Sequence, residues 1–220
     1  DDQPAYAPAR HFRARVEWDA GELDAAESDL AAALDAAPAY ADARVDASRL
    51  ALERQQFAEA IATASAGLAR DPAHLGLLRA LGHALLRVGN GEAAAAAFNQ
   101  ASMLQPLDAE TQYNLGVAHQ LAGDAEAAAQ SYRHASAFDP AFLDATFNLA
   151  VLLQQQGHPK AAEAAYRGLL ARDPKRDAAW KNLGEMLREQ GRHDDLIRGE
   201  GIYATLWRVQ TGERLRVAGD

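Results

Sequence analysis

The hydrophobic and small residues of this 220-residue chain recur at an interval of 34 residues. A leucine followed by a small residue stands at Leu81-Gly82, Leu115-Gly116, Leu149-Ala150 and Leu183-Gly184. Prolines keep the same interval at Pro38, Pro72, Pro106, Pro140 and Pro174. Proline cannot continue a helix and biases the residue before it away from helical geometry, so each proline marks the loop where a unit ends. A period of this length predicts one helix–turn–helix unit repeated along the chain.

Alignment on the prolines divides a single domain over residues 1–220 into successive units. They cover residues 7–40, 41–74, 75–108, 109–142, 143–176 and an irregular 177–210, followed by a tail at 211–220. Position 15 predicts a left-handed end to the first helix of five units, at Gly21, Gly89, Gly123, Gly157 and Gly191. Position 20 is Ala26, Ala60, Ala94, Ala128 or Ala162, and position 24 is Phe98, Tyr132 or Tyr166 in three units. Small residues at positions 8 and 20 allow the two antiparallel helices of a unit to approach closely. We expect Asp124 to cap the helix that follows it and Pro159 to lie in a first helical turn.

These positions resemble the tetratricopeptide repeat, which has small residues at positions 8 and 20, an aromatic residue at 24 and proline at 32. The resemblance extends over about residues 7–192. It implies an all-α, right-handed superhelical solenoid of about six repeats, closed by a C-terminal capping helix. The high alanine content and the lack of strand-type runs agree with an all-α class.

The first and last units depart from the pattern. Arg10 and Arg13 replace expected apolar residues in the first unit, which is typical of a polar terminal cap. The last unit predicts a second helix over about 194–210 that buries Leu196, Ile197, Tyr203, Leu206 and Trp207 as the C-terminal cap. Residues 191–210 also show a weak resemblance to the C-terminal tail of ATP-binding-cassette exporters. The phosphate-binding loop of such proteins is missing from the sequence, so no ATPase activity carries over.

The candidate binding site is the concave face formed by the first helices of the repeats. Tyr113, Val117, Phe147 and Val151 would form an apolar floor. Asn114, Asn148 and Asn182 recur at position 6 and resemble the asparagine ladder in the repeat domain of O-linked N-acetylglucosamine transferase. An amide both donates and accepts, so this ladder would hold the backbone of an extended peptide. Local hydrogen bonding by these asparagines remains an open alternative. The other candidates on this face are Arg79, His83, Arg87, Gln120, Gln154 and Lys181, and Arg79 and Arg87 are candidates for attracting an acidic segment.

Composition and motifs exclude several kinds of function. The net charge of −9 leaves no basic stripe for nucleic acid. Without cysteine there is no disulfide or thiolate metal site, and the seven histidines form no metal-binding motif. No apolar run is long enough for membrane insertion, and no catalytic constellation or cofactor motif is found.

We therefore expect a non-catalytic scaffold that binds a protein or an extended peptide in its groove. Two alternatives remain open: the repeat portion of a larger glycosyl- or sulfotransferase, and a self-assembling homo-oligomer. Abundant alanine and arginine with little lysine suggest a bacterial protein, and the sequence leaves its location open between cytoplasm and periplasm.

Overall fold

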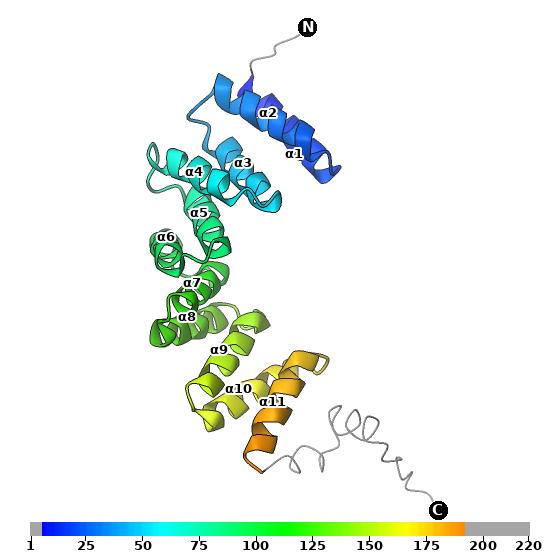
Figure 1. Cartoon of the computed structure of the whole chain (residues 1–220), viewed down its shortest axis with the longest axis vertical. Helices are drawn as coiled ribbons and strands as arrows, with labels where there is room; N and C mark the ends of the chain where they lie inside the picture. The colour runs from blue at the N-terminus through cyan, green and yellow to red at the C-terminus, as the bar shows by residue number, and fades with distance from the viewer. Residues whose placement is uncertain (1–5, 192–220) are drawn as a thin grey trace, which may run out of the picture. The chain divides into compact units, whose positions relative to one another are not determined.

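The computed structural model describes residues 6–191, which form eleven α-helices and contain no strand (Figure 1). The all-α prediction is confirmed. The chain falls into two compact units that divide between Phe138 and Asp139. Each unit is described by itself below, and the arrangement of the whole chain as one continuous domain stays a prediction.

The helices follow the repeat boundaries that the sequence predicts. The first unit contains α1 (Ala7–Asp19), α2 (Leu23–Ala36), α3 (Ala41–Glu53), α4 (Phe57–Leu68), α5 (Leu75–Arg87), α6 (Gly91–Leu104), α7 (Ala109–Leu121) and α8 (Ala125–Phe138). The second unit contains α9 (Leu143–Gln155), α10 (Pro159–Arg172) and α11 (Asp177–Glu189). Odd-numbered helices are therefore the first helices of their repeats, and even-numbered helices are the second.

The residue at position 15 takes a left-handed conformation after the first helix of each repeat, and it is usually glycine. All five glycines predicted there have φ between 69° and 83°, at Gly21, Gly89, Gly123, Gly157 and Gly191. The second repeat has Gln55 instead, and its φ is 62°. The predicted cap is also confirmed, since the backbone N–H of Ala127 donates to Oδ1 of Asp124 at 3.0 Å. Pro159 begins α10, as expected.

The small residues set the spacing between paired helices. The five alanines at position 20 are fully buried, with no exposed surface. Gly82 faces the ring of Phe98 and Gly116 faces the ring of Tyr132, so closely that an added Cβ would lie 2.6 Å from either ring. In the second repeat, Ser48 takes the glycine's place and its hydroxyl donates to the carbonyl oxygen of Ala60 at 2.9 Å. Positions 8 and 20 thus lie at the close contact within the hairpin, as the repeat pattern predicts. The aromatic residues at position 24, Phe98 and Tyr132, pack against position 8 of their own repeat.

The first repeat adds a charge pair to its apolar core. Arg13 stands where later repeats have leucine, and its guanidinium pairs with the buried carboxylate of Asp29 on α2. Hydrogen bonding from Arg13 holds the pKa of Asp29 below its usual value, although burial opposes the shift. Arg13 and Asp29 are therefore partnered within the hairpin.

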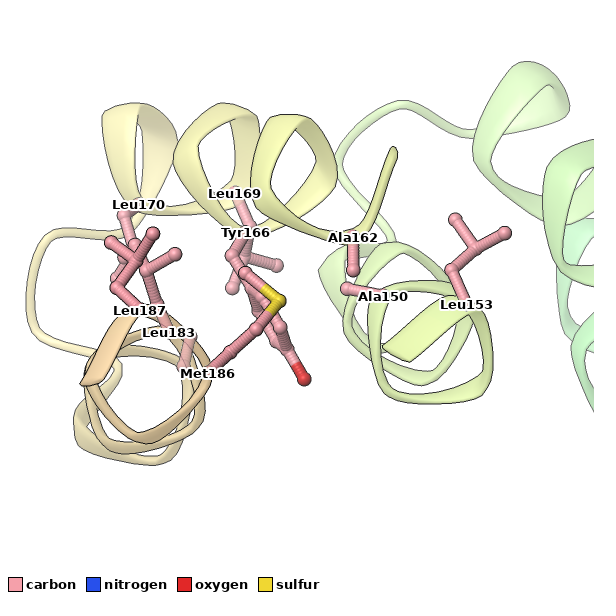
Figure 2. Packing of buried hydrophobic residues seen from close by; sticks show 10 residues of the cluster. Ala150, Leu153, Ala162, Tyr166, Leu169, Leu170, Leu183, Met186 and Leu187 are labelled. Carbon is pink, nitrogen blue, oxygen red and sulfur yellow. The ribbon is translucent and has the colours of Figure 1, made fainter. Parts of the chain in front are cut away.

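The core of the second unit lies between α10 and its neighbours (Figure 2). Leu183, Met186 and Leu187 of α11 point toward Tyr166 and Leu169 of α10, and all five side chains are buried. On the other side, Ala162 of α10 faces Ala150 of α9. The predicted C-terminal capping helix and the exporter-like segment lie outside the described residues, apart from Gly191.

Candidate protein-binding face

We use the name groove face for the side of each first helix that carries repeat positions 5, 6, 9 and 12. Every candidate residue except Arg87 lies on this face, and Arg87 follows at position 13. The structure gives most of these side chains a defined partner.

Arg79 and His83 on α5 belong to an ordered part of the groove face. Nε of Arg79 donates to Oγ1 of Thr111 at 3.0 Å, and its guanidinium pairs with Asp108, the N-cap of α7. Burial favours the neutral form of Asp108, but hydrogen bonds from Thr111 and Arg79 outweigh it, and the pKa of this carboxyl is lowered. Arg79 therefore joins α5 to α7 and is only one quarter exposed.

His83 packs edge-on against Phe98, with the ring centroids 5.3 Å apart. Burial lowers the pKa of its imidazole, outweighing the attraction of Glu110. A lowered pKa favours the neutral imidazole, which is a hydrogen-bonding group and not a cation. The guanidinium of Arg87, one turn later, lies 5.0 Å from the ring centroid of Phe57.

The groove face of α7 carries the half-buried side chains of Tyr113, Asn114 and Val117. The ring of Tyr113 lies 5.9 Å from that of Tyr132, so one of its faces is used in packing. Oε1 of Gln120 accepts a hydrogen bond of 2.9 Å from the hydroxyl of Tyr132. Gln120, proposed from the sequence as a ligand contact, thus also supports the tyrosine of its own hairpin.

The second unit repeats this arrangement. The ring of Phe147 lies 6.3 Å from that of Tyr166, and the guanidinium of Arg176 covers it at 4.9 Å from its centroid. Oε1 of Gln154 accepts from the hydroxyl of Tyr166 at 3.0 Å, and Nδ2 of Asn182 donates to the same hydroxyl at 3.3 Å. This bond supports the local hydrogen-bonding alternative for Asn182. Asn148 and Val151 are half-buried and Lys181 is exposed.

A cleft of about 460 Å³ lies on the groove face of the earlier repeats. Its apolar lining comes from α1, α3 and α5, with Trp18, Val45, Leu52 and Ala80. Two predicted residues, Arg79 and His83, line it together with Arg49 and Glu53. Nε1 of Trp18 donates to Oε2 of Glu53 at 2.7 Å, which fixes the indole at one wall.

The sequence reasoning missed the α1 and α3 contributions to this cleft. Val45 stands at position 5, Arg49 at position 9, and Trp18 and Leu52 at position 12, which are the positions used to choose candidates in the later repeats. The signal was therefore present, but the first two repeats lack the regular position-6 asparagine and were interpreted as a cap and a divergent unit.

Neither a metal site nor a membrane span is found in the part of the chain that the structure describes. No three His, Asp or Glu side chains among residues 6–191 gather as metal ligands would. None of the helices there is both long and apolar enough to cross a bilayer.

Comparison with known families identifies the fold. Residues 79–141 and 147–195 match one tetratricopeptide repeat model, and residues 17–72 match a second. The chain therefore belongs to the tetratricopeptide repeat family.

Solved structures of other repeat proteins superpose on most of the chain. MamA protein aligns with a TM-score of 0.68 and 20% identity, covering 80% of this chain and 94% of its own. YrrB, described as a TPR protein with an unusual peptide-binding site, aligns with a TM-score of 0.69 and 19% identity over 79% of this chain and 89% of its own. PilF of Pseudomonas aeruginosa aligns with a TM-score of 0.75 and 16% identity, covering 96% of this chain and 94% of its own. At these identities the likeness shows the fold. No curated protein matches the chain in sequence.

Proposed function

We propose that the chain is a non-catalytic scaffold that binds a segment of another protein along its groove face. The family and the fold support a protein-interaction role. The observation that carries the finer proposal is the cleft over α3 and α5, because it combines an apolar floor with a charged rim. Interfaces typically place apolar anchors in such a hollow and surround them with polar groups.

Similarity to YrrB supports a peptide as the ligand. That protein's description names a peptide-binding site, and its structure matches this chain at the level of the fold. An extended peptide also suits a face made of parallel first helices, because one ligand can contact the same position in successive repeats.

We propose further ligand contacts on the first helices of the later repeats, one set in each unit. Tyr113 and Asn114 share one helix of the first unit, and Phe147 and Asn148 share one helix of the second. In each pair a half-buried ring lies next to a half-buried amide. We assign the ring to an apolar side chain of the ligand and the amide to its backbone.

A displayed random-peptide library, selected on the intact chain, tests this proposal. The selected peptides are then titrated by calorimetry into Val45→Asp, Tyr113→Ala and Phe147→Ala variants. Ala58→Asp, on the exposed surface of α4, is the matched control for the introduced charge. We expect at least one groove-face variant to weaken binding about tenfold while the control binds normally.

The asparagines are tested separately, by combining Asn114→Ala with Asn148→Ala. Weaker peptide binding with little change in thermal stability supports their assignment to the ligand. Unchanged affinity with a large loss of stability assigns them to local structure instead. If every groove-face variant binds the selected peptides as the unmodified chain does, the proposed face is wrong.

A further inference from the structure

A smaller cleft, of about 180 Å³, lies between α2, α3 and α4, where the first repeat meets the second. Its apolar lining includes Leu30 and Leu34 from α2, and Ala47 and Leu50 from α3. Positions 5, 6, 9 and 12 of α3 do not line it, so it is separate from the groove face. We call it the α2–α4 cleft.

The α2–α4 cleft lies where two side chains are smaller than in later repeats. Leu30 stands at position 24 of the first repeat and Ala47 at position 7 of the second. At the junction of the third and fourth repeats the same positions carry Phe98 and Leu115, which pack in one buried cluster. Ala47 is only partly buried, although it packs against the cluster that contains Leu30. The first junction therefore lacks an aromatic ring that a later junction takes from its own sequence.

The volume of the cleft suits one aromatic ring. An engineered protein cavity of about 150 Å³ with apolar walls binds benzene. A space of about 180 Å³ therefore holds a six-membered ring with one substituent. An apolar ring in this space would gain the contacts that Leu30 and Ala47 leave unmade.

Gln56, the residue before α4, brings an unsatisfied acceptor to this cleft. Its Oε1 is buried and has no hydrogen-bond partner among the residues that the structure describes. A buried acceptor without a donor lowers stability. The terminal torsion of glutamine is broad, so the amide can turn this oxygen toward the cleft that the side chain lines. A ligand that carries a hydrogen-bond donor would satisfy it.

The fourth repeat already pairs a phenol with a glutamine. The hydroxyl of Tyr132, at position 24, donates to Oε1 of Gln120 at 2.9 Å. The first repeat has Leu30 at that position and therefore no hydroxyl. A phenol in the α2–α4 cleft would supply both the missing ring and a donor for Gln56.

The charged residues of the lining do not select an ion. Glu27 is paired with Arg54 at 3.2 Å, and Nη2 of Arg44 donates to the carbonyl oxygen of Pro38 at 2.8 Å. Glu59 is exposed to solvent. The lining thus has carboxylates and a guanidinium together, which favours a neutral ligand over a cation or an anion.

The surface around the cleft favours a small molecule over a protein partner. A protein interface surrounds its central pocket with further apolar contacts. None of the large apolar side chains of α2 and α4 is exposed, and the exposed ones of the described residues lie on other helices and loops. The cleft therefore offers one buried ring site without a wider docking surface.

We propose that the α2–α4 cleft binds a small neutral phenol, whose ring packs against Leu30, Ala47 and Leu50 and whose hydroxyl donates to Oε1 of Gln56. This site goes beyond the proposed function, because it lies away from the groove face. The bound ring would touch both of the first two repeats and hold them together.

NMR titration of the full chain with phenol and with toluene tests the proposal. Toluene has nearly the same shape but no donor. Ala47→Leu fills the cleft with the leucine that later repeats have at position 7, and Ala58→Leu makes the same change at an exposed site on α4 as its control. Gln56→Met keeps the length of the side chain and removes the acceptor, and it decides the question if Ala47→Leu does not fold.

We expect phenol to bind the unmodified chain about tenfold more tightly than toluene and to shift the amide signals of Leu30, Ala47 and Gln56. Apolar contact alone would favour toluene, which is the more apolar of the two. Ala47→Leu should bind phenol about tenfold or more weakly, because the added side chain occupies the ring site, while Ala58→Leu binds normally. Gln56→Met should lose the preference for phenol.

Three results overturn the proposal: no binding of phenol, binding of toluene as tight as that of phenol, or full affinity for phenol in either Ala47→Leu or Gln56→Met. A peptide with one central tyrosine is the last probe. If it binds in this cleft more tightly than phenol does, the occupant is a side chain of a partner protein and the assignment to a small molecule is overturned. Each of these results leaves the peptide-binding scaffold standing, because that proposal is tested by Val45→Asp, Tyr113→Ala and Phe147→Ala on the groove face.

Discussion

The hydroxyl of Tyr132 donates a hydrogen bond of 2.9 Å to Oε1 of Gln120, twelve residues earlier in the chain. Tyr166 repeats the bond with Gln154 at 3.0 Å and the same separation. Each pair joins position 24 of a repeat to position 12. Because the tyrosine ring is fully buried, its hydroxyl needs such a partner at the edge of the core. The groove face and the core are therefore linked within each hairpin.

Removing these hydroxyls should weaken the fold by a modest amount. Tyr132→Phe loses the hydrogen bond to Gln120, and Tyr166→Phe loses the matching bond to Gln154. Each change should lower the free energy of unfolding by about 1 kcal/mol or more. Urea denaturation followed by circular dichroism measures both. Tyr6→Phe, at a residue 59% exposed, is the control. Equal stability in all three variants would contradict a structural role for the glutamines.

The glycine at position 8 gives a second prediction. In Gly116→Ala the new Cβ would lie 2.6 Å from the ring of Tyr132, so the ring must shift. We expect a loss of about 1–3 kcal/mol, typical of overpacking in a filled core. The matched control is Gly168→Ala on α10, where no atom lies within 4 Å of the added Cβ. That change should stabilise the protein by up to about 1 kcal/mol through helix propensity. A loss of the same size in both variants would show that close packing at Gly116 is not the cause.

The repeat pattern was sufficient to predict the fold within each hairpin. Proline spacing located the loops, and the glycines at position 15 predicted a left-handed turn that five φ values confirm. These features are local, because a proline or a glycine acts through its own backbone. Packing against the rest of the protein therefore changes the backbone preference of these prolines and glycines very little.

The side-chain partners of the site were harder to predict. The sequence predicted Gln120 and Gln154, at position 12, as ligand contacts in the groove. In the structure each accepts a hydrogen bond from the tyrosine on the second helix of its repeat. A pair of this kind depends on how two helices meet, which spacing alone does not specify. Likewise, the arginines of the first repeat suggested a solvated cap, whereas Arg13 pairs with the buried Asp29.

The one repeat without a glycine at position 15 offers a third prediction. Gln55 has φ of 62°, a conformation that costs a non-glycine residue about 1 kcal/mol or more. Gln55→Gly should raise the free energy of unfolding by about 0.5–1 kcal/mol, since relief of strain exceeds the added entropy of the unfolded chain. The reverse change, Gly89→Gln at φ of 80°, has open space around it and should destabilise by a similar amount. Thermal melting of the two variants checks the prediction, and a lower midpoint for Gln55→Gly would contradict it.

His83 makes stability depend on pH. Burial lowers its pKa in the folded protein below the value of 6.5 that it has when exposed, while Glu110 opposes and Arg49 and Arg79 add to the shift. Well above pH 6.5 His83 is neutral in both the folded and the unfolded chain, so its contribution to the free energy of unfolding is fully present. As the pH falls below 6.5 the unfolded chain takes up the proton first, so stability is lost until the folded-state pKa is passed.

The corresponding experiment compares the free energy of unfolding at about pH 8 and about pH 5 in the unmodified chain and in His83→Gln. His83→Gln should lose less stability over this range, because it lacks the imidazole whose proton affinity differs between the folded and unfolded states. His158→Gln, at an exposed histidine before α10, should retain the dependence of the unmodified chain. If His83→Gln and His158→Gln show the same pH dependence, the imidazole of His83 is not buried as the structure places it.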